Sequence, residues 1–314
     1  MTRDHSILRS IFEPLLGFKK IIAEKPDIVM ISPVGSYLFT IIPLIILSKL
    51  FLNKNYRTKF LLKSDWSLDY TGLSVLKKAL SIVLFIISSY IFDKVLLETY
   101  CGLSKANNLP LVRTDRTARL PIGFPSNSMS IHRYDNGKRE KIVLCVARIA
   151  RMKDQLTLVK AFGKASKLYK DWKLVLAGPI EDSDYKRELD ELIRILRLGS
   201  SIEFTGFVDE NKLRMLYESA SIFCLPSRFL ENAGNVKYEA IGAGLPVIST
   251  DIPCERDNEE LGVMLFKAGD FDYLSGILER LMGSEEMRRE VSERSQKRLV
   301  SYTEIVNELL SLLK

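Results

Sequence analysis

Cysteine and histidine are scarce in this sequence, and their scarcity excludes several kinds of site. Only four cysteines and two histidines occur in 314 residues, and no two cysteines form a CxxC pair. A zinc ribbon or a thioredoxin-like redox site is therefore unsupported. Cys145 and Cys224 lie inside apolar runs, where a free cysteine usually acts as a small buried hydrophobe, and a reducing, cytoplasmic setting fits best. No GxGxxG, Walker A, HExxH or GxSxG pattern is present.

The composition is that of a globular protein, but its charge is uneven. Hydrophobic residues make up 46% and charged residues 27%, which is enough for a sizeable core in about two domains. Residues 1–137 carry 18 Lys and Arg against 10 Asp and Glu, whereas residues 138–314 carry 28 against 29. The basic front half suits an anionic membrane or a phosphorylated substrate, and a solvated basic surface is the plain alternative. No nucleic-acid recognition motif occurs, so we expect no nucleic-acid partner.

The back half has a regular alternation of short apolar segments and helix-length segments. The pattern predicts strands alternating with helices at 141–146, 154–168, 173–177, 184–198, 202–204, 210–219, 222–225, 235–243 and 246–249. Short apolar strands separated by helices of this length are typical of a doubly wound parallel sheet.

The front half is less regular. Strands are predicted at 28–32, 59–63 and 94–97, helices at 7–23, 37–52 (interrupted by Pro43) and 76–92, and irregular structure at 105–127. Residues 28–48 contain no charged side chain, so by length they could be a buried helix, a helix in the membrane interface or a membrane span. The apolar stretch 79–92 is too short for a span and suits a core or interfacial helix.

The first candidate site follows the strand predicted at 141–146. Arg148 and Lys153 lie between this strand and the next helix, where ligands bind in doubly wound sheets. Two cations beside a helix N-terminus suit a phosphate group. The plain alternative is a loop with solvated cations.

The second candidate site follows the strand predicted at 222–225. Glu231 precedes a predicted helix and Glu239 lies inside it, about 12 Å further along at 1.5 Å per residue. Carboxylates so far apart can hold the two ends of an elongated ligand through its hydroxyls. Between them, Gly234 and Asn235 allow close approach of a diphosphate to the backbone. A nucleotide-sugar has this layout, and a helix cap with a solvated glutamate is the alternative.

Taken together, the motifs of residues 138–270 resemble the donor-binding domain of retaining GT-B glycosyltransferases of family 4. The matching elements, in order, are Arg148…Lys153, Gly178-Pro179, Phe204–Val208, Pro226-Ser227, Glu231…Glu239 (an E-x7-E element) and Glu239–Ile248. The resemblance implies two Rossmann-like domains with parallel sheets facing across a cleft. It also implies transfer with retention of configuration and without a bound metal or other cofactor.

The resemblance assigns roles to individual residues. Arg148 and Lys153 would neutralise the donor diphosphate, and Glu231 would contact the donor sugar. Glu239 would bind the ribose. The remaining donor-binding positions would be Gly206, Phe207 and Val208 near the base and Asn232, Ala233, Gly234, Asn235 and Val236 along the phosphates.

The front half resembles the acceptor domain of the same family less closely. Lys25–Val29 and Asp93–Val95 are similar to two of its strand entries. The family's first strand, Gly-rich loop and helix have no counterpart before them, which implies an incomplete N-terminal domain. The histidine often found after a middle strand is also missing, and we expect Asp65 to serve in its place as a catalytic residue. Asp182-Ser183-Asp184 has DxD spacing, but helix capping by Ser183 or Asp184 is the better interpretation.

These observations predict an α/β protein of three parts. Residues 1–134 form a shortened acceptor domain, 135–285 a donor domain, and 286–314 a helical segment that crosses back to the first domain. We expect a hexosyltransferase that uses a nucleotide-diphosphate sugar and a glycan or lipid-linked acceptor. It would be cytoplasmic, with peripheral contact to an anionic membrane. The alternative is a non-catalytic nucleotide-sugar-binding subunit or an inactive, truncated transferase.

Overall fold

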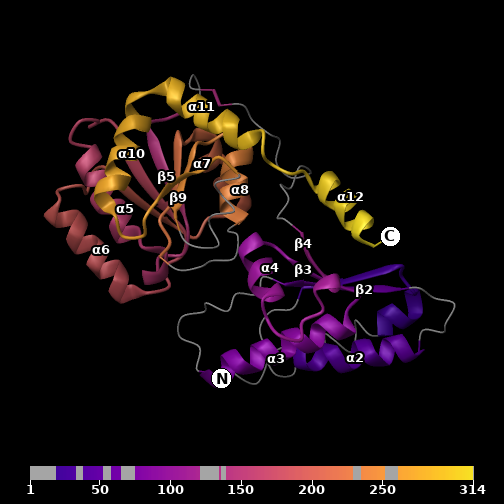
Figure 1. Cartoon of the computed structure of the whole chain (residues 1–314). Helices are drawn as coiled ribbons and strands as arrows, with labels where there is room; N and C mark the ends of the chain where they lie inside the picture. Colours follow the sequence, from indigo (N-terminus) through magenta and orange to yellow (C-terminus); the bar gives the residue numbers. More distant parts are fainter. Residues whose placement is uncertain are drawn as a thin grey trace. The chain divides into compact units, whose positions relative to one another are not determined.

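The chain divides into two compact units (Figure 1). The computed structural model describes residues 19–32, 38–51, 58–64, 75–120, 134–135, 139–228, 235–251 and 261–313. The first unit groups Met1–Pro121 with Val306–Lys314, and the second is Ile122–Ile305. The structural divisions therefore fall after Pro121 and after Ile305. The sequence analysis had placed the domain boundaries after residues 134 and 285 instead.

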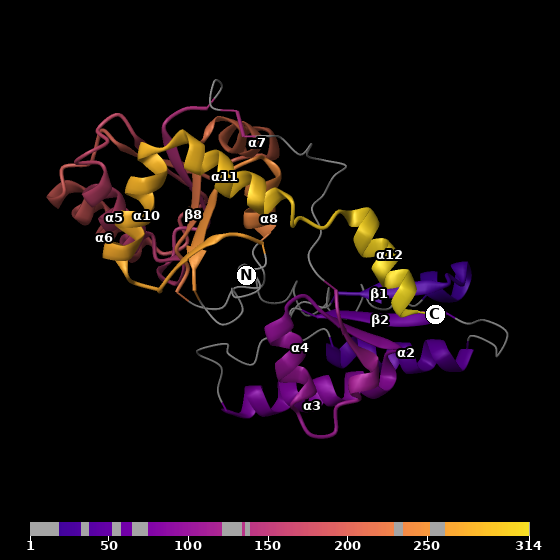
Figure 2. The same ribbon diagram turned by 45° about the horizontal axis from the view of Figure 1, so that its top comes forward.

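The first unit contains a parallel sheet whose strands are ordered as in the chain. Its elements are β1 (Ile28–Ile31), α2 (Leu38–Phe51), β2 (Lys59–Ser64), α3 (Val75–Ile91), β3 (Lys94–Leu97), α4 (Tyr100–Asn107) and β4 (Thr117–Arg119). The sheet order is β1-β2-β3-β4 and every pair is parallel. Each strand pairs with the one before it, always on the same side, and right-handed connections of this kind place all their helices on one face of the sheet. Accordingly, α2 and α3 lie side by side against the same face (Figures 1 and 2).

The core of the first unit lies between this sheet and its helices. Phe60 and Val95 from the strands meet Ile42 of α2 and Phe85 of α3 in one buried cluster. The helix α2 continues through Pro43, which the sequence analysis took as an interruption. Pro43 is exposed, and it removes only one backbone donor from a helix that is held by packing on its other side.

Two elements depart from the irregular structure predicted at 105–127: α4 begins before this stretch and overlaps it at 105–107, and β4 lies inside it. The helix α4 is capped by the side chain of Thr99, which accepts a hydrogen bond from Gly102 N. The strand β4 is only three residues long and pairs with β3. Of the helix predicted at 7–23, residues 19–24 are helical and the part before residue 19 lies outside the described residues.

The second unit contains a six-stranded parallel sheet with the order β10-β9-β8-β5-β6-β7. Its elements are β5 (Ile142–Val146), α5 (Gln155–Ala165), β6 (Lys173–Ala177), α6 (Ser183–Ile195), β7 (Ile202–Gly206), α7 (Glu210–Ser219), β8 (Ile222–Leu225), α8 (Asn235–Gly242), β9 (Val247–Thr250), β10 (Met264–Phe266), α10 (Phe271–Gly283), α11 (Glu285–Gln296) and the start of α12 (Tyr302–Leu312). The chain moves outward from β5 to β7 and then returns to the other side of β5. The strand order therefore reverses between β5 and β8.

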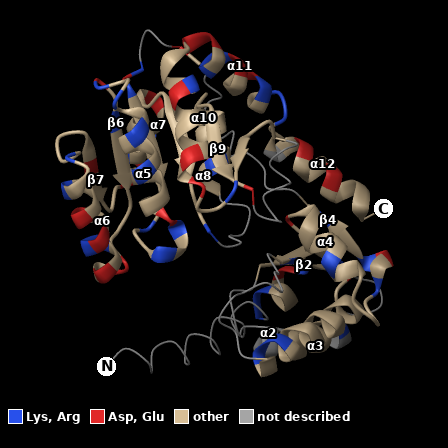
Figure 3. Ribbon diagram, turned by 60° about the vertical axis from the view of Figure 1, so that its left-hand side comes forward, with Lys and Arg blue, Asp and Glu red and all other residues tan. Residues whose placement is uncertain are grey.

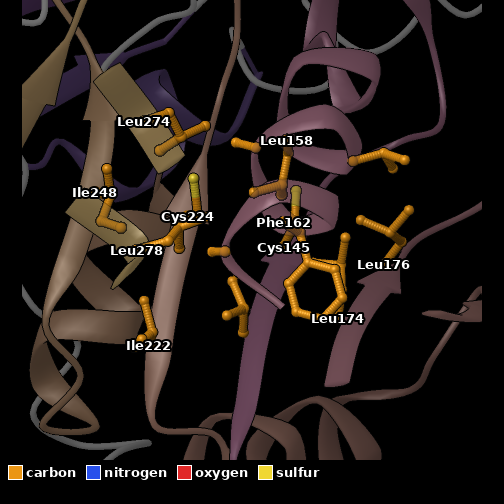
Figure 4. Packing of buried hydrophobic residues seen from close by; sticks show 14 of the residues in the cluster. Cys145, Leu158, Phe162, Leu174, Leu176, Ile222, Cys224, Ile248, Leu274 and Leu278 are labelled. Atoms are coloured by element: carbon orange, nitrogen blue, oxygen red, sulfur yellow. The ribbon is translucent and has the colours of Figure 1, made fainter. Parts of the chain in front are cut away.

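The central strands β5 and β8, with the sequences IVLCV and IFCL, are apolar throughout because helices cover both faces of the sheet. On one face, Phe162 of α5 and Leu278 of α10 pack over Cys145 and Cys224 (Figure 4). On the other face, α7 and α8 contribute the buried rings of Tyr217 and Tyr238. The prediction that Cys145 and Cys224 are small buried hydrophobes is confirmed, neither forms a disulfide, and burial raises the pKa of the Cys224 thiol.

The alternation predicted for the back half is confirmed, and each unit is an α/β layer structure built on a parallel sheet. In the part of the chain that the structure describes, no helix is both long and apolar enough to cross a bilayer.

Candidate functional site

Two loops of the second unit flank the point where the strand order reverses. Residues 147–154 follow β5 and residues 226–234 follow β8, and β5 and β8 are neighbours in the sheet. In open α/β sheets ligands bind beyond the carboxyl ends of the strands at such a switch point. Arg148 and Lys153, and residues 226–228 that lead into the second motif, therefore lie where this rule places ligands, and Arg228 N donates a hydrogen bond to Met152 O at 2.9 Å.

An ion pair joins the same two loops. Arg228 Nε lies 2.7 Å from Asp154 Oδ2, and the hydroxyl of Thr157 donates to the same oxygen at 2.7 Å. Asp154 is 2% exposed and has a left-handed backbone with φ 47°, a conformation that Asp tolerates better than most residues. The pair with Asp154 raises the pKa of the Arg228 guanidinium. Asp154 follows Lys153 directly, so the pair fixes the end of the cationic loop.

The backbone of the Arg148 loop is held from two sides. The buried amide of Gln155 donates to Arg148 O at 2.9 Å. On the other side, the turn after β6 approaches so closely that a Cβ on Gly178 would lie 2.2 Å from Ala147 O. With φ 146°, Gly178 also has a conformation that other residues rarely adopt. The Arg148 side chain pairs with Glu181, and both are about half exposed.

The loop after β7 carries the third set of predicted donor-binding residues. Gly178 N donates to Gly206 O at 3.0 Å, which ties the end of β6 to the end of β7. Phe207 follows with its side chain 79% exposed, and Val208 is partly buried. Asp209 then caps α7 by accepting from Lys212 N at 2.8 Å.

Glu239 lies on α8 and is held by a tyrosine of α7. The hydroxyl of Tyr217 donates to Glu239 Oε2 at 3.0 Å. Burial raises the pKa of the Glu239 carboxyl, and the hydrogen bond from Tyr217 opposes part of this shift. Asn235 and Val236 are the first residues of α8, and the first N–H groups of a helix have no partner within the helix, which suits them to an anion.

Several predicted site residues lie outside the described residues. In the second unit these are Glu231, Asn232, Ala233 and Gly234. In the first unit, Asp65 follows Ser64, the last residue of β2. Among the residues that the structure does describe, no three His, Cys, Asp or Glu side chains gather as a metal site.

The DxD-like triplet is part of a helix cap, but its capping residue differs from the prediction. Asp182 caps α6 by accepting from Tyr185 N at 2.9 Å. Ser183 and Asp184, the residues expected to cap, are the first residues of the helix, and Asp184 pairs with Arg187. The cap lies one residue earlier because the extended residue that precedes the helix is Asp182.

Sequence reasoning missed the residues that position the site. Asp154, Arg228, Gln155 and Tyr217 were given no role. Asp154 and Arg228 are adjacent to predicted motifs, and their opposite charges offered a weak signal. The pairing of Tyr217 with Glu239 joins two helices and had no local signature.

The fold defines the class of this protein. Two α/β units whose described residues form parallel sheets of four and six strands have the architecture of GT-B proteins, as predicted. The structure of Anabaena HepE in complex with UDP-glucose superposes with a TM-score of 0.76 at 15% identity, covering 96% of this chain and 81% of that one. Sucrose-phosphate synthase of Thermosynechococcus elongatus superposes with a TM-score of 0.72 at 18% identity, covering 100% and 79%.

The sequence then defines the family. Residues 130–298 match the family model for glycosyl transferases group 1, so the chain belongs to that family. It is 27% identical over 240 residues to mannosylfructose-phosphate synthase of Agrobacterium fabrum, covering 70% of this chain and 50% of that protein. It is 27% identical over 297 residues to sulfoquinovosyl transferase SQD2 of Arabidopsis thaliana, covering 88% and 54%. The chain thus spans about half the length of these relatives.

Proposed function

We propose that this protein transfers a hexose-type sugar from a nucleotide-diphosphate sugar to an acceptor hydroxyl. The observation that carries the proposal is the junction of the two motif loops at the switch point between β5 and β8, where Arg228 bonds both Met152 and Asp154. Membership of the glycosyl transferases group 1 family supports it. Anabaena HepE, a neighbour in fold, was solved with UDP-glucose.

In this proposal the cations of the β5–α5 loop stabilise the leaving diphosphate. Arg148 and Lys153 lie on a loop whose backbone is fixed by Gln155 and Gly178. Charge that develops on the departing phosphate is stabilised most by donors that are already in position. The diphosphate competes with Glu181 for the Arg148 guanidinium. Asn235 and Val236 at the start of α8 add backbone N–H groups.

The two ends of the donor would be held by different elements. Glu239 is partly buried beside Tyr217 and would accept hydrogen bonds from the ribose hydroxyls. The exposed ring of Phe207, with Gly206 and Val208, would lie along the base. Glu231 and the residues up to Gly234 would contact the sugar and the phosphates. Membership of family 4, retention of configuration and independence of metal are parts of the same proposal.

The acceptor is proposed to be a glycan or a lipid-linked glycan, with Asp65 at the acceptor side. Among the relatives are a sulfoquinovosyl transferase and an alpha-monoglucosyldiacylglycerol synthase of Streptococcus pneumoniae, the latter 28% identical over 151 residues. The basic front half of the chain supports a location on the cytoplasmic face of an anionic membrane.

A panel of UDP-, GDP- and ADP-sugars tests the proposal. Because a ligand that binds only the folded state raises apparent stability, one donor class should raise Tm by several degrees at about 100 times its Kd. The same donor should release its nucleoside diphosphate on incubation with acceptor lipids or glycans. If no nucleotide-sugar raises Tm, the proposal is wrong. Binding without any release would favour a non-catalytic sugar-nucleotide-binding subunit.

Two further measurements address the finer parts of the proposal. Release should persist after dialysis against EDTA, because the loop cations and helix N-terminus stabilise the diphosphate. The anomeric proton coupling of the product should match that of the donor. A loss of activity that added Mg²⁺ restores would contradict metal independence, and an inverted product would contradict retention.

Donor affinity should decline below a pH that is higher than for an ordinary glutamate. Burial raises the pKa of Glu239, and only its ionised form accepts hydrogen bonds from both ribose hydroxyls. As the pH is lowered, Glu239 therefore becomes protonated, and donor affinity declines, at a higher pH than an ordinary glutamate would. Titration of an intact nucleotide-sugar between pH 5 and 8 checks this, since its diphosphate diester has no proton to release in that range.

The Tyr217→Phe variant should move this loss to still higher pH. The hydrogen bond from the Tyr217 hydroxyl lowers the pKa of Glu239, so removal of the hydroxyl raises that pKa. Because one hydrogen bond is lost, the donor affinity at pH 8 should also fall by about 2- to 10-fold. Glu239→Gln is the matched control, because its weaker binding should not depend on pH in this range. An unchanged pH profile in Tyr217→Phe would show that the tyrosine does not control this carboxylate.

A further inference from the structure

The outer side of α3 is a continuous apolar stripe. Leu76, Leu80, Val83, Ile87 and Tyr90 recur at spacings of four and three residues, which places them on one side of a helix. All five are exposed, with Leu80 at 43%, Val83 at 49% and Ile87 at 39%. The opposite side of the helix buries Phe85, Ser88 and Ser89. The helix therefore packs its side with both serine and phenylalanine against the core and exposes its apolar side, whereas a surface helix usually buries its apolar side.

The neighbouring helix extends this stripe. Ile46 and Leu47 of α2 are also exposed, whereas Ile42 and Ile45 pack into the core. Because α2 and α3 pack against each other and lie side by side in both views (Figures 1 and 2), their exposed apolar side chains form one surface. We call this surface the α2–α3 face. Soluble proteins rarely expose contiguous apolar surface of this kind without a binding partner.

The helix α6 of the second unit shows what an ordinary solvated helix of this chain is like. Its exposed positions carry Asp184, Arg187, Glu188, Glu191 and Arg194, and charged residues cover it in Figure 3. The helices α2 and α3 contain no acidic residue, and their only charged residues are Lys49, Lys77 and Lys78. The continuous run of exposed apolar residues on α3 thus contrasts with α6, on which Ile195 in the last turn is the one exposed large apolar residue.

The charges at this surface favour one occupant. Lys77 and Lys78 lie in the first turn of α3, where Lys77 is exposed and Lys78 lies on the partly buried side, away from the stripe. Tyr90 lies at the other end of the stripe, where the guanidinium of Arg113, which is paired with Asp115, is 6.0 Å from its ring centre. A second copy of the chain would supply no acidic residue from its own α2 or α3 to pair with Lys77. An anionic lipid surface offers phosphates to the cations and an apolar interior to the stripe. Tyrosine and lysine at the edges of an apolar surface suit the interface of a bilayer.

We propose that the α2–α3 face docks on an anionic lipid membrane, with both helices lying in the plane of the interface. The inference deepens the proposed function, on which it rests for the membrane-bound acceptor, by assigning the surface through which the enzyme reaches that acceptor. Neither helix needs to span the bilayer: α2 has 14 residues and α3 has 17.

Flotation of the full-length chain with vesicles tests the proposal. Vesicles of phosphatidylcholine with about 30% phosphatidylglycerol should carry the protein upward, and vesicles of phosphatidylcholine alone should carry at least about fivefold less. Binding should weaken, but persist, when salt is raised to about 0.5 M, because screening reduces the attraction of the lysines and leaves the apolar contact. Absence of binding to the anionic vesicles would overturn the proposal.

Variants identify the surface. Leu80→Glu combined with Val83→Glu should weaken vesicle binding at least about tenfold, because both side chains leave the apolar interface and two negative charges enter it. The matched control is Ile195→Glu with Met215→Glu, which introduces the same charges at exposed apolar positions of α6 and α7 and should leave binding unchanged. Equal loss in both variants, or in neither, would overturn the proposal.

Two readouts separate the possible failures. Donor-induced Tm shifts should be the same in wild type and in the Leu80/Val83 variant, which also shows that the variant folds. If no donor shifts Tm while vesicle binding holds, the proposed function fails and the membrane surface stands. Light scattering tests the other occupant: a dimer in wild type that Leu80→Glu dissociates, together with no vesicle binding, would assign the α2–α3 face to self-association and overturn the proposal.

Discussion

Replacement of Lys153 with alanine is expected to lower kcat/KM for release of the nucleoside diphosphate by about 10²- to 10³-fold. Lys153 ends the loop after β5 at the switch point of the sheet. A fixed cation there stabilises charge that grows on the leaving phosphate, so its loss raises the barrier more than it weakens ground-state binding. Most of the decrease should therefore be in kcat, measured by steady-state kinetics with the donor class that raises Tm.

Arg151 supplies a matched control for this experiment. It lies in the same short turn as Lys153, but its guanidinium pairs with Glu188 of α6 and lies 5.6 Å from the centre of the Tyr185 ring. Because Arg151 is committed to α6, Arg151→Ala should change kcat/KM by less than about threefold, the scale of a surface ion pair. If Arg151→Ala were as damaging as Lys153→Ala, or if Lys153→Ala kept its kcat, the loop would not hold the leaving group as proposed.

The regular part of the fold could be predicted because local pattern and burial agree there. Segments such as Ile142–Val146 and Ile222–Leu225 are apolar throughout, since helices cover both faces of the sheet. By contrast, β4 has the sequence TAR and is half-buried in the first unit. Its strand structure comes from pairing with β3, which leaves no apolar run to recognise.

The candidate site divides in the same way. Arg148 and Lys153 could be selected because they follow a predicted strand, and Glu239 because it lies on the helix after another strand, since topology places ligands at strand ends. The strand order that makes β5 and β8 neighbours was not readable from the chain. The contacts that depend on it, Arg228 with Asp154 and Tyr217 with Glu239, could not be predicted, because they join residues far apart in sequence.

The pair of Asp154 and Arg228 should respond asymmetrically to mutation. Asp154 is almost fully buried, whereas the Arg228 side chain is 51% exposed. Arg228→Met removes the cation and leaves a buried carboxylate with the Thr157 hydroxyl, which should lower the free energy of unfolding by about 2–4 kcal/mol. Asp154→Asn leaves an arginine that water can solvate, and Asn tolerates the left-handed backbone, so the loss should be about 1 kcal/mol or less.

Urea unfolding followed by the fluorescence of the buried Trp172, in a Trp66→Phe background, would measure both variants. The double variant should regain most of what Arg228→Met loses, because the orphaned charge is gone. An Asp154→Asn variant as unstable as Arg228→Met would show that the ion pair is not what holds the two loops together.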